Sequence, residues 1–198
     1  MHSARIRTAW KNKRRPISTE EHAVAVAAVA WRIALSAARN LHQAAFDYTD
    51  DAQRLAVMRE YLYFLIYFAD RCAQQWFASD PARRARFTTR LSHECRRHYR
   101  ENRRDIMAPE PAAERFIEQL NRRLSAYAST RFVDGRPGYA ALRALALRIR
   151  EQMGHDQTNK WVLEQVLDID GPEALQIFGA ALRKLTQAVE KARGGDGG

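Results

Sequence analysis

The sequence predicts an all-α protein, a bundle of six or seven helices around one central apolar helix. Apolar residues make up 46% of the 198 residues, which is too many for a disordered chain. Glycine and proline number only 9 and 6, so few positions interrupt a helix. Alanine, leucine and arginine dominate the composition, and β-branched residues are few, which favours helices almost throughout.

The chain is organised as one domain with two short appendages. A basic arm covers residues 1–17, a single all-helical domain covers 18–193, and a flexible glycine-rich tail covers 194–198. A domain of this size is large enough to bury a substantial hydrophobic core.

The first two predicted helices carry clear start signals. The first covers about 18–46, where Ser18 and Glu21 have the spacing of a capping box. The second covers about 51–78, with Asp50 as its N-cap. Its middle, YLYFLIYFA, is apolar on every side, as in a helix enclosed by other helices. We therefore expect this second helix to lie at the centre of the bundle.

The rest of the chain supplies the surrounding helices. We expect them at about 81–107, 111–128, 138–153, 157–168 and 172–193. Asp80 and Pro81 suit the cap and the first helical position of the third helix. The segment STRFVDGRPG is interpreted as an irregular loop, and no strand is predicted. DIDGP is interpreted as a helix stop at Gly171 followed by a helix start at Pro172.

The formal net charge of +10 is concentrated in two segments. Residues 80–106 hold nine arginines against four acids. The basic arm holds six cations and no acid: Arg5, Arg7, Lys11, Lys13, Arg14 and Arg15. The remaining residues sum to −1, so this distribution is typical of a binding footprint rather than of general solubility. Arginine outnumbers lysine 28 to 5, however, so a compositional bias accounts for part of the richness.

A cationic stripe follows one face of the third predicted helix. Its members recur at spacings of three and four residues: Arg86, Arg90, His93, Arg97, Arg100 and Arg104. On a helix they fall within an arc of roughly 80° and span about 27 Å. Solvated helix faces usually mix charge signs, whereas Glu94 and Glu101 lie only at the margin of this arc. The pattern leaves two interpretations open, a docking face for an acidic partner and a plain solvated face.

The sequence contains no complete motif for catalysis, for metal binding or for cofactor binding. HECRRH resembles a zinc motif, but His93 and His98 are five residues apart, about 140° around a helix. There is no Glu-x-x-His pair, no G-x-S-x-G, no phosphate loop and no dinucleotide fingerprint. We therefore assign no catalytic residue, no metal ligand and no cofactor, which favours a non-enzymatic protein. The best helix-turn-helix candidate, 157–185, has a nearly apolar second helix that belongs in a core.

The cysteines and the N-terminal region favour a cytoplasmic protein. Cys72 and Cys95 would lie roughly 10 Å apart on antiparallel helices, too far for a disulfide, so we expect buried reduced thiols. KNKRRPIST before AVAVAAVAW loosely resembles a twin-arginine leader, but the charged residues Glu20 and Glu21 interrupt it, so we expect no export. No run approaching the ~18 apolar residues of a membrane span is expected.

Three function classes remain. The first is a binding or regulatory module that docks an acidic partner, a nucleic acid backbone or an acidic protein surface, through the cationic stripe and the basic arm. The second is a helical ligand-pocket protein or enzyme built around four aromatic residues: Tyr61, Tyr63, Tyr67 and Trp76. The simpler interpretation of the three tyrosines is that they are core aromatics whose hydroxyls reach the surface or a hydrogen-bond partner. The third is a structural or adaptor homodimer in which the basic segments have little role.

Overall fold

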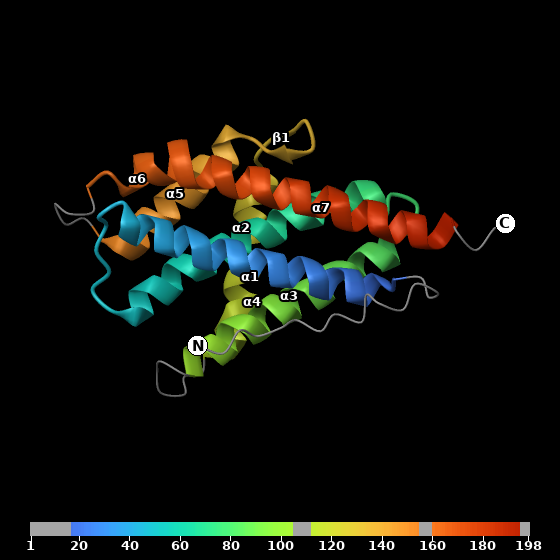
Figure 1. The fold of residues 1–198 in the computed structure, drawn as a ribbon, viewed down its shortest axis with the longest axis horizontal. Coiled ribbons are helices and arrows are strands. Elements are labelled where there is room, and N and C mark those ends of the chain that lie inside the picture. The colour runs from blue at the N-terminus through green and yellow to red at the C-terminus, as the bar shows by residue number, and fades with distance from the viewer. Residues whose placement is uncertain (1–16, 105–111, 155–159, 195–198) are drawn as a thin grey trace.

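The computed structural model describes residues 17–104, 112–154 and 160–194, and it confirms the all-α fold (Figure 1). The helices are α1 (Thr19–Gln43), α2 (Asp51–Trp76), α3 (Pro81–Arg104), α4 (Ala112–Ala128), α5 (Tyr139–Met153), α6 (Val162–Gln165) and α7 (Gly171–Gly194). A π-helical turn, Val166–Asp170, joins α6 to α7. Two very short strands, β1 (Phe132–Val133) and β2 (Arg136–Pro137), lie between α4 and α5.

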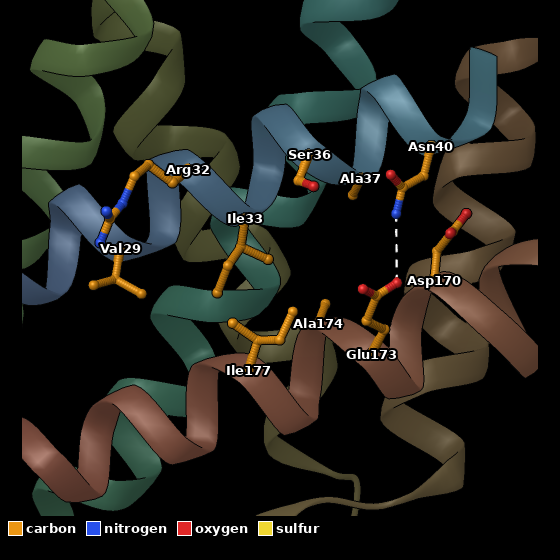
Figure 2. Close-up of a pocket in the computed structure, with 10 residues that line it drawn as sticks. All are labelled: Val29, Arg32, Ile33, Ser36, Ala37, Asn40, Asp170, Glu173, Ala174 and Ile177. Carbon is orange, nitrogen blue, oxygen red and sulfur yellow. Dashed lines mark hydrogen bonds between the residues drawn. The ribbon is translucent and has the colours of Figure 1, made fainter. Parts of the chain in front are cut away.

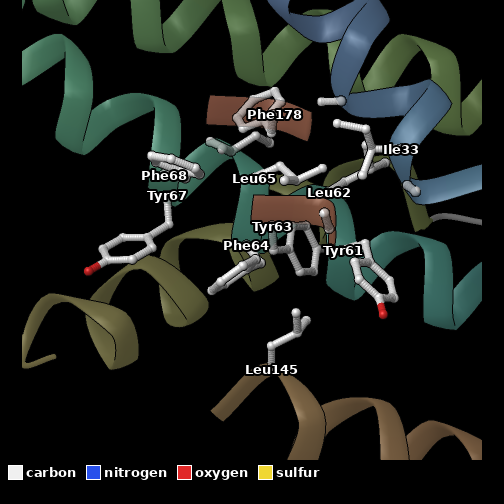
Figure 3. Close-up of a cluster of buried hydrophobic side chains, with 14 of the residues drawn as sticks. Ile33, Tyr61, Leu62, Tyr63, Phe64, Leu65, Tyr67, Phe68, Leu145 and Phe178 are labelled. Carbon is white, nitrogen blue, oxygen red and sulfur yellow. The ribbon is translucent and has the colours of Figure 1, made fainter. Parts of the chain in front are cut away.

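Helix α2 provides the largest share of the aromatic core. Ten consecutive residues, 60–69, are buried, and α1, α3, α4 and α5 all pack against this helix. Figure 3 shows side chains leaving α2 in every direction, with Ile33 of α1, Leu145 of α5 and Phe178 of α7 around them. A helix that is apolar on all sides gains most from such enclosure, because no face of it has to meet water.

The predicted starts of the first three helices carry the expected caps. At α1 the capping box is complete: the Glu21 amide donates to Ser18 Oγ (3.0 Å), and the Ser18 amide donates to Glu21 Oε2 (2.9 Å). Asp50 accepts from the amide of Gln53 at 2.7 Å, and Asp80 accepts from the amide of Arg83 at 2.9 Å. Each cap satisfies backbone donors that the first helical turn leaves unpaired.

Helix α1 lies between α3 and α7 (Figure 1). Its contact surface is made largely of alanine: Ala23, Ala27, Ala30, Ala34, Ala37 and Ala38 are all buried. Small side chains let the helix axes come close together, so α1 contacts neighbours on both sides. This position makes α1 one wall of the cleft that it forms with α7.

Helix α1 is also long and apolar enough to cross a membrane, judged by length and composition alone. The prediction that no run of the chain approaches this composition was therefore wrong. Its alanines and valines raise the mean hydropathy, and few charges interrupt them. Helices in the core of a bundle have the same composition, and α1 packs against α2, α3 and α7. The apolar composition of α1 is therefore weak evidence for a membrane span. The absence of a membrane span stays a prediction.

The segment between α4 and α5 is a β-hairpin rather than an irregular loop. Phe132 pairs with Pro137 and Val133 pairs with Arg136 in antiparallel register. The two turn residues, Asp134 (φ 51°) and Gly135 (φ 72°), both have positive φ, as a two-residue hairpin turn requires. An Asp-Gly pair is a signal for a two-residue hairpin turn, and the prediction of no strand overlooked it.

The predicted helix stop at Gly171 was also wrong. Gly171 has helical dihedral angles (φ −70°, ψ −49°), and the chain passes from the π-helical turn directly into α7. A Cβ atom at this position would lie 2.4 Å from Leu142 Cδ1 and 2.5 Å from the Val166 carbonyl oxygen. Glycine is therefore required by close packing against α5 and the preceding turn, not by the end of a helix.

Candidate functional site

The cationic stripe lies on the outer face of α3, and all six of its side chains are exposed. The opposite face of the same helix is buried through Phe87, Leu91, Cys95 and Tyr99. This division follows from the helical period, because residues three and four positions apart share a face. The structure therefore brings the six predicted residues together on one exposed surface.

Carboxylates neutralise part of the stripe. Glu94 is buried, with its side chain 7% exposed, and each of its oxygens meets one arginine at 2.8 Å, from Arg90 on one side and Arg97 on the other. Arg97 also reaches Glu101 at 3.0 Å. Arg86 lies 3.9 Å from Glu20 of α1. The sequence placed Glu94 and Glu101 at the margin of the stripe, but arginine side chains are long enough to reach them there.

The uncompensated charge gathers at the C-terminal half of α3. Arg100 and Arg104 form no ion pair with the described residues, and neither does His93. Cations near a helix C-terminus are favoured by the helix dipole, so this end of α3 holds positive charge at little cost. Among the described residues, the stripe thus has a paired segment at Arg86, Arg90 and Arg97, while Arg100 and Arg104 have no ion-pair partner there.

The basic arm lies outside the described residues. This applies to all six of its predicted binding residues: Arg5, Arg7, Lys11, Lys13, Arg14 and Arg15. Their contribution to binding stays a prediction.

The four aromatic residues predicted as an alternative pocket lie in the interior or against it. The Tyr63 hydroxyl donates to Gln119 Oε1 at 3.3 Å, and the Tyr67 hydroxyl lies 3.1 Å from Thr130 Oγ1. The Tyr61 hydroxyl is buried without a hydrogen-bond partner within the described part of the chain. Trp76 packs against His22 and Phe87, with ring centroids 5.7 and 6.1 Å away.

These four side chains do not converge on one space. Figure 3 shows the hydroxyls of Tyr61 and Tyr67 on opposite sides of α2. The ring of Tyr63 packs at 4.9 Å on Phe116, while that of Tyr67 packs at 5.1 Å on Tyr127. Their contacts are those of core aromatics, and a ligand site built on them stays a prediction.

A cleft that the sequence did not predict lies between α1 and α7 (Figure 2). Its volume is about 300 Å³. The middle is lined by apolar side chains, among them Val29, Ile33, Ala174 and Ile177. One end carries Arg32, and the other carries Asn40, Asp170 and Glu173.

Asp170 is the unusual group of this cleft, because it is only 3% exposed. Its Oδ2 atom has no hydrogen-bond partner among the described residues. Burial raises the pKa of Asp170 from 3.8 to about 6, although hydrogen bonds from Gln165 and Asn40 act in the opposite direction. Beside it, Asn40 Nδ2 donates to Glu173 Oε2 at 3.4 Å. The cleft therefore holds a carboxylate that burial penalises and that has spare acceptor capacity.

Comparison with known proteins adds no functional information. No model of a known protein family, no curated protein and no solved structure matches the chain. Among the described residues, no group of three or more His, Cys, Asp or Glu side chains is placed to hold a metal ion.

Proposed function

We propose that this protein is a non-enzymatic binding module that docks an acidic partner on the exposed face of α3. The observation that carries the proposal is the cationic stripe itself: six exposed side chains in one row along a helix, spanning about 27 Å. Arg100 and Arg104 form no ion pair with the described residues, so no ion pair within that part of the chain has to break before they bind a partner. The cytoplasmic location and a homodimeric state stay predictions.

The chemistry of arginine supports an anionic partner. A guanidinium group presents a planar fork of donors that binds phosphate or carboxylate through two parallel hydrogen bonds. A straight row of such groups fits an extended polyanion, and a nucleic acid backbone is the partner we favour. Because phosphate contacts carry no sequence information, binding should tolerate changes of base sequence. An acidic protein surface is the alternative partner.

The paired arginines are a poor place to test the proposal. Removing Arg90 and Arg97 would leave Glu94 buried without its cations, so a loss of binding could follow from a loss of structure. The variant Arg100→Gln/Arg104→Gln avoids this problem, because neither arginine forms an ion pair with a described residue. Glutamine keeps much of the side-chain length and the helix propensity.

A matched control removes the same charge elsewhere. Arg136 of β2 and Arg143 of α5 are exposed, and no ion pair joins them to described residues. We expect Arg100→Gln/Arg104→Gln to weaken binding of a labelled 20-base-pair duplex by about tenfold or more at about 50 mM salt, measured by fluorescence anisotropy. Arg136→Gln/Arg143→Gln should bind nearly as the wild type does.

Two outcomes would count against this proposal. Equal loss in both variants would mean that net charge alone attracts the duplex and that the stripe is not a site. No wild-type binding to DNA or RNA would exclude the nucleic acid partner and leave acidic protein surfaces to be tried with the same pair of variants.

A further inference from the structure

The acidic end of the cleft between α1 and α7 combines features that a purely structural site does not need. Asp170 ends the π-helical turn, and Glu173 follows it by three residues in the first turn of α7. Asn40 faces them from α1 (Figure 2). π-Helical turns are rare and occur often at functional sites, because they redirect side chains that a regular helix would place elsewhere. Here the turn ends at the one buried carboxylate of the cleft.

The Asp170 oxygen without a hydrogen bond, Oδ2, indicates the charge that a ligand of this cleft would carry. A buried acceptor without a hydrogen bond costs free energy that a bound donor would recover. Gln165 and Asn40 hydrogen-bond the Asp170 carboxylate, and Asn40 also donates to Glu173 Oε2 at 3.4 Å. Even so, Asp170 Oδ2 and the nearby Tyr61 hydroxyl, whose pKa Asp170 helps to raise, have no partner among the described residues. Two carboxylates three residues apart, with no described cation paired to either, favour a positively charged ligand group.

The rest of the cleft indicates an organic cation rather than a bare metal ion. Its middle is apolar, and Ile177 is 48% exposed there, so a ligand body lying over this side chain would remove apolar surface from water. Two carboxylates and one amide are too few oxygen ligands for Ca²⁺, which takes six to eight. A volume of about 300 Å³ lies at the small end of the range for ligand pockets.

The other end of the cleft limits the ligand to one positive charge. Arg32 lies there, eight residues before Asn40 on the same helix, or about 12 Å along its axis. A second cation on the ligand would meet this guanidinium. We propose that the cleft binds a small organic monocation, an ammonium or guanidinium group on an apolar body, with the cation at Asp170 and Glu173 and the body over Ile33 and Ile177.

The test uses 2-phenylethylammonium as the probe and 2-phenylethanol as its neutral counterpart of the same shape. Binding is followed on the full chain at pH 7.5 by backbone amide shifts in ¹H–¹⁵N spectra. The ammonium ion should shift the amides of Ser36, Asn40 and Ala174 and bind at least tenfold more tightly than the alcohol. MgCl₂ or CaCl₂ alone should not produce these shifts.

Variants locate the charge recognition. Asp170→Asn keeps the side-chain shape and should weaken the ammonium ion at least tenfold, and Glu173→Gln should weaken it severalfold. The control is Asp168→Asn, because Asp168 lies in the same π-helical turn but is exposed and does not line the cleft. It should bind the probe as the wild type does.

Three results would overturn the inference: equal binding of the ammonium ion and the alcohol, equal binding by Asp170→Asn and Asp168→Asn, or divalent cations shifting the cleft amides when the ammonium ion does not. If Asp170→Asn does not fold, the comparison of ammonium ion with alcohol on the wild-type protein decides alone. The cationic stripe takes no part in this experiment, so its outcome is independent of the proposed docking function.

Discussion

The ion pair between α2 and α4 provides a quantitative test of the packing described here. Glu60 is fully buried, and Arg123 donates two hydrogen bonds to its carboxylate, from Nε to Oε2 at 2.7 Å and from Nη2 to Oε1 at 2.9 Å. This hydrogen bonding raises the pKa of Arg123 above its ordinary value. Arg123→Met keeps the aliphatic stem of the side chain but leaves the Glu60 carboxylate buried without its charged partner.

The expected cost is large for this reason. Removing one partner of a buried pair typically costs about 3 to 5 kcal/mol, a large part of the 5–15 kcal/mol by which domains are stable. The neighbouring residue gives the control, because Arg122 pairs with Glu118 on the exposed side of α4. Arg122→Met should therefore cost about 0.5 kcal/mol or less.

Urea unfolding followed by circular dichroism at 222 nm measures both variants. A double variant, Glu60→Met/Arg123→Met, removes the buried charge as well as its partner, so it should recover most of the loss. The reasoning would be refuted if Arg123→Met cost no more than Arg122→Met. It would also fail if the double variant were less stable than Arg123→Met alone.

Two further predictions concern buried titratable groups. Because the folded pKa of Asp170, about 6, lies above its ordinary 3.8, the folded state binds more protons between these values, and stability should fall as pH rises from about 4 to 6. Asp170→Asn should therefore raise the free energy of unfolding by roughly 1 to 2 kcal/mol at pH 7.5 and by less at pH 4.5. The value is below that of the full pKa shift because the side chain borders an open cleft. A lower free energy of unfolding for Asp170→Asn at pH 7.5, measured in urea, would contradict this. Cys72 and Cys95 are free and buried, and burial raises the pKa of Cys72 to about 12. Thiol-reactive reagents at pH 8 should therefore label both cysteines only slowly until the protein unfolds. Rapid labelling of the native protein would contradict their buried placement.

Local signals in the sequence were sufficient for the helix starts. The caps at Ser18, Asp50 and Asp80 act within three or four residues, so their spacing alone predicts the bonds that form. The exposed placement of the cationic stripe was predictable for the same reason, since the helical period fixes which residues share a face.

Long-range packing was not predictable in this way. Asn40 and Glu173 are 133 residues apart in the chain, and only the pairing of α1 with α7 brings them together. Gly171 was interpreted from its local preference as a helix stop, whereas contact with Leu142 of α5 determines its role. The pairing of Glu94 with two stripe arginines depends on side-chain reach and burial, which helical spacing alone does not supply.

The salt dependence of duplex binding tests the central claim most directly. Each phosphate contact contributes about 0.9 to the slope of log K against log salt concentration, so the wild-type protein should show a slope of several units between about 50 and 200 mM salt. We predict that Arg100→Gln/Arg104→Gln lowers this slope by about two and that Arg136→Gln/Arg143→Gln leaves it unchanged. An identical slope for all three proteins would contradict the assignment of the α3 face as the docking surface.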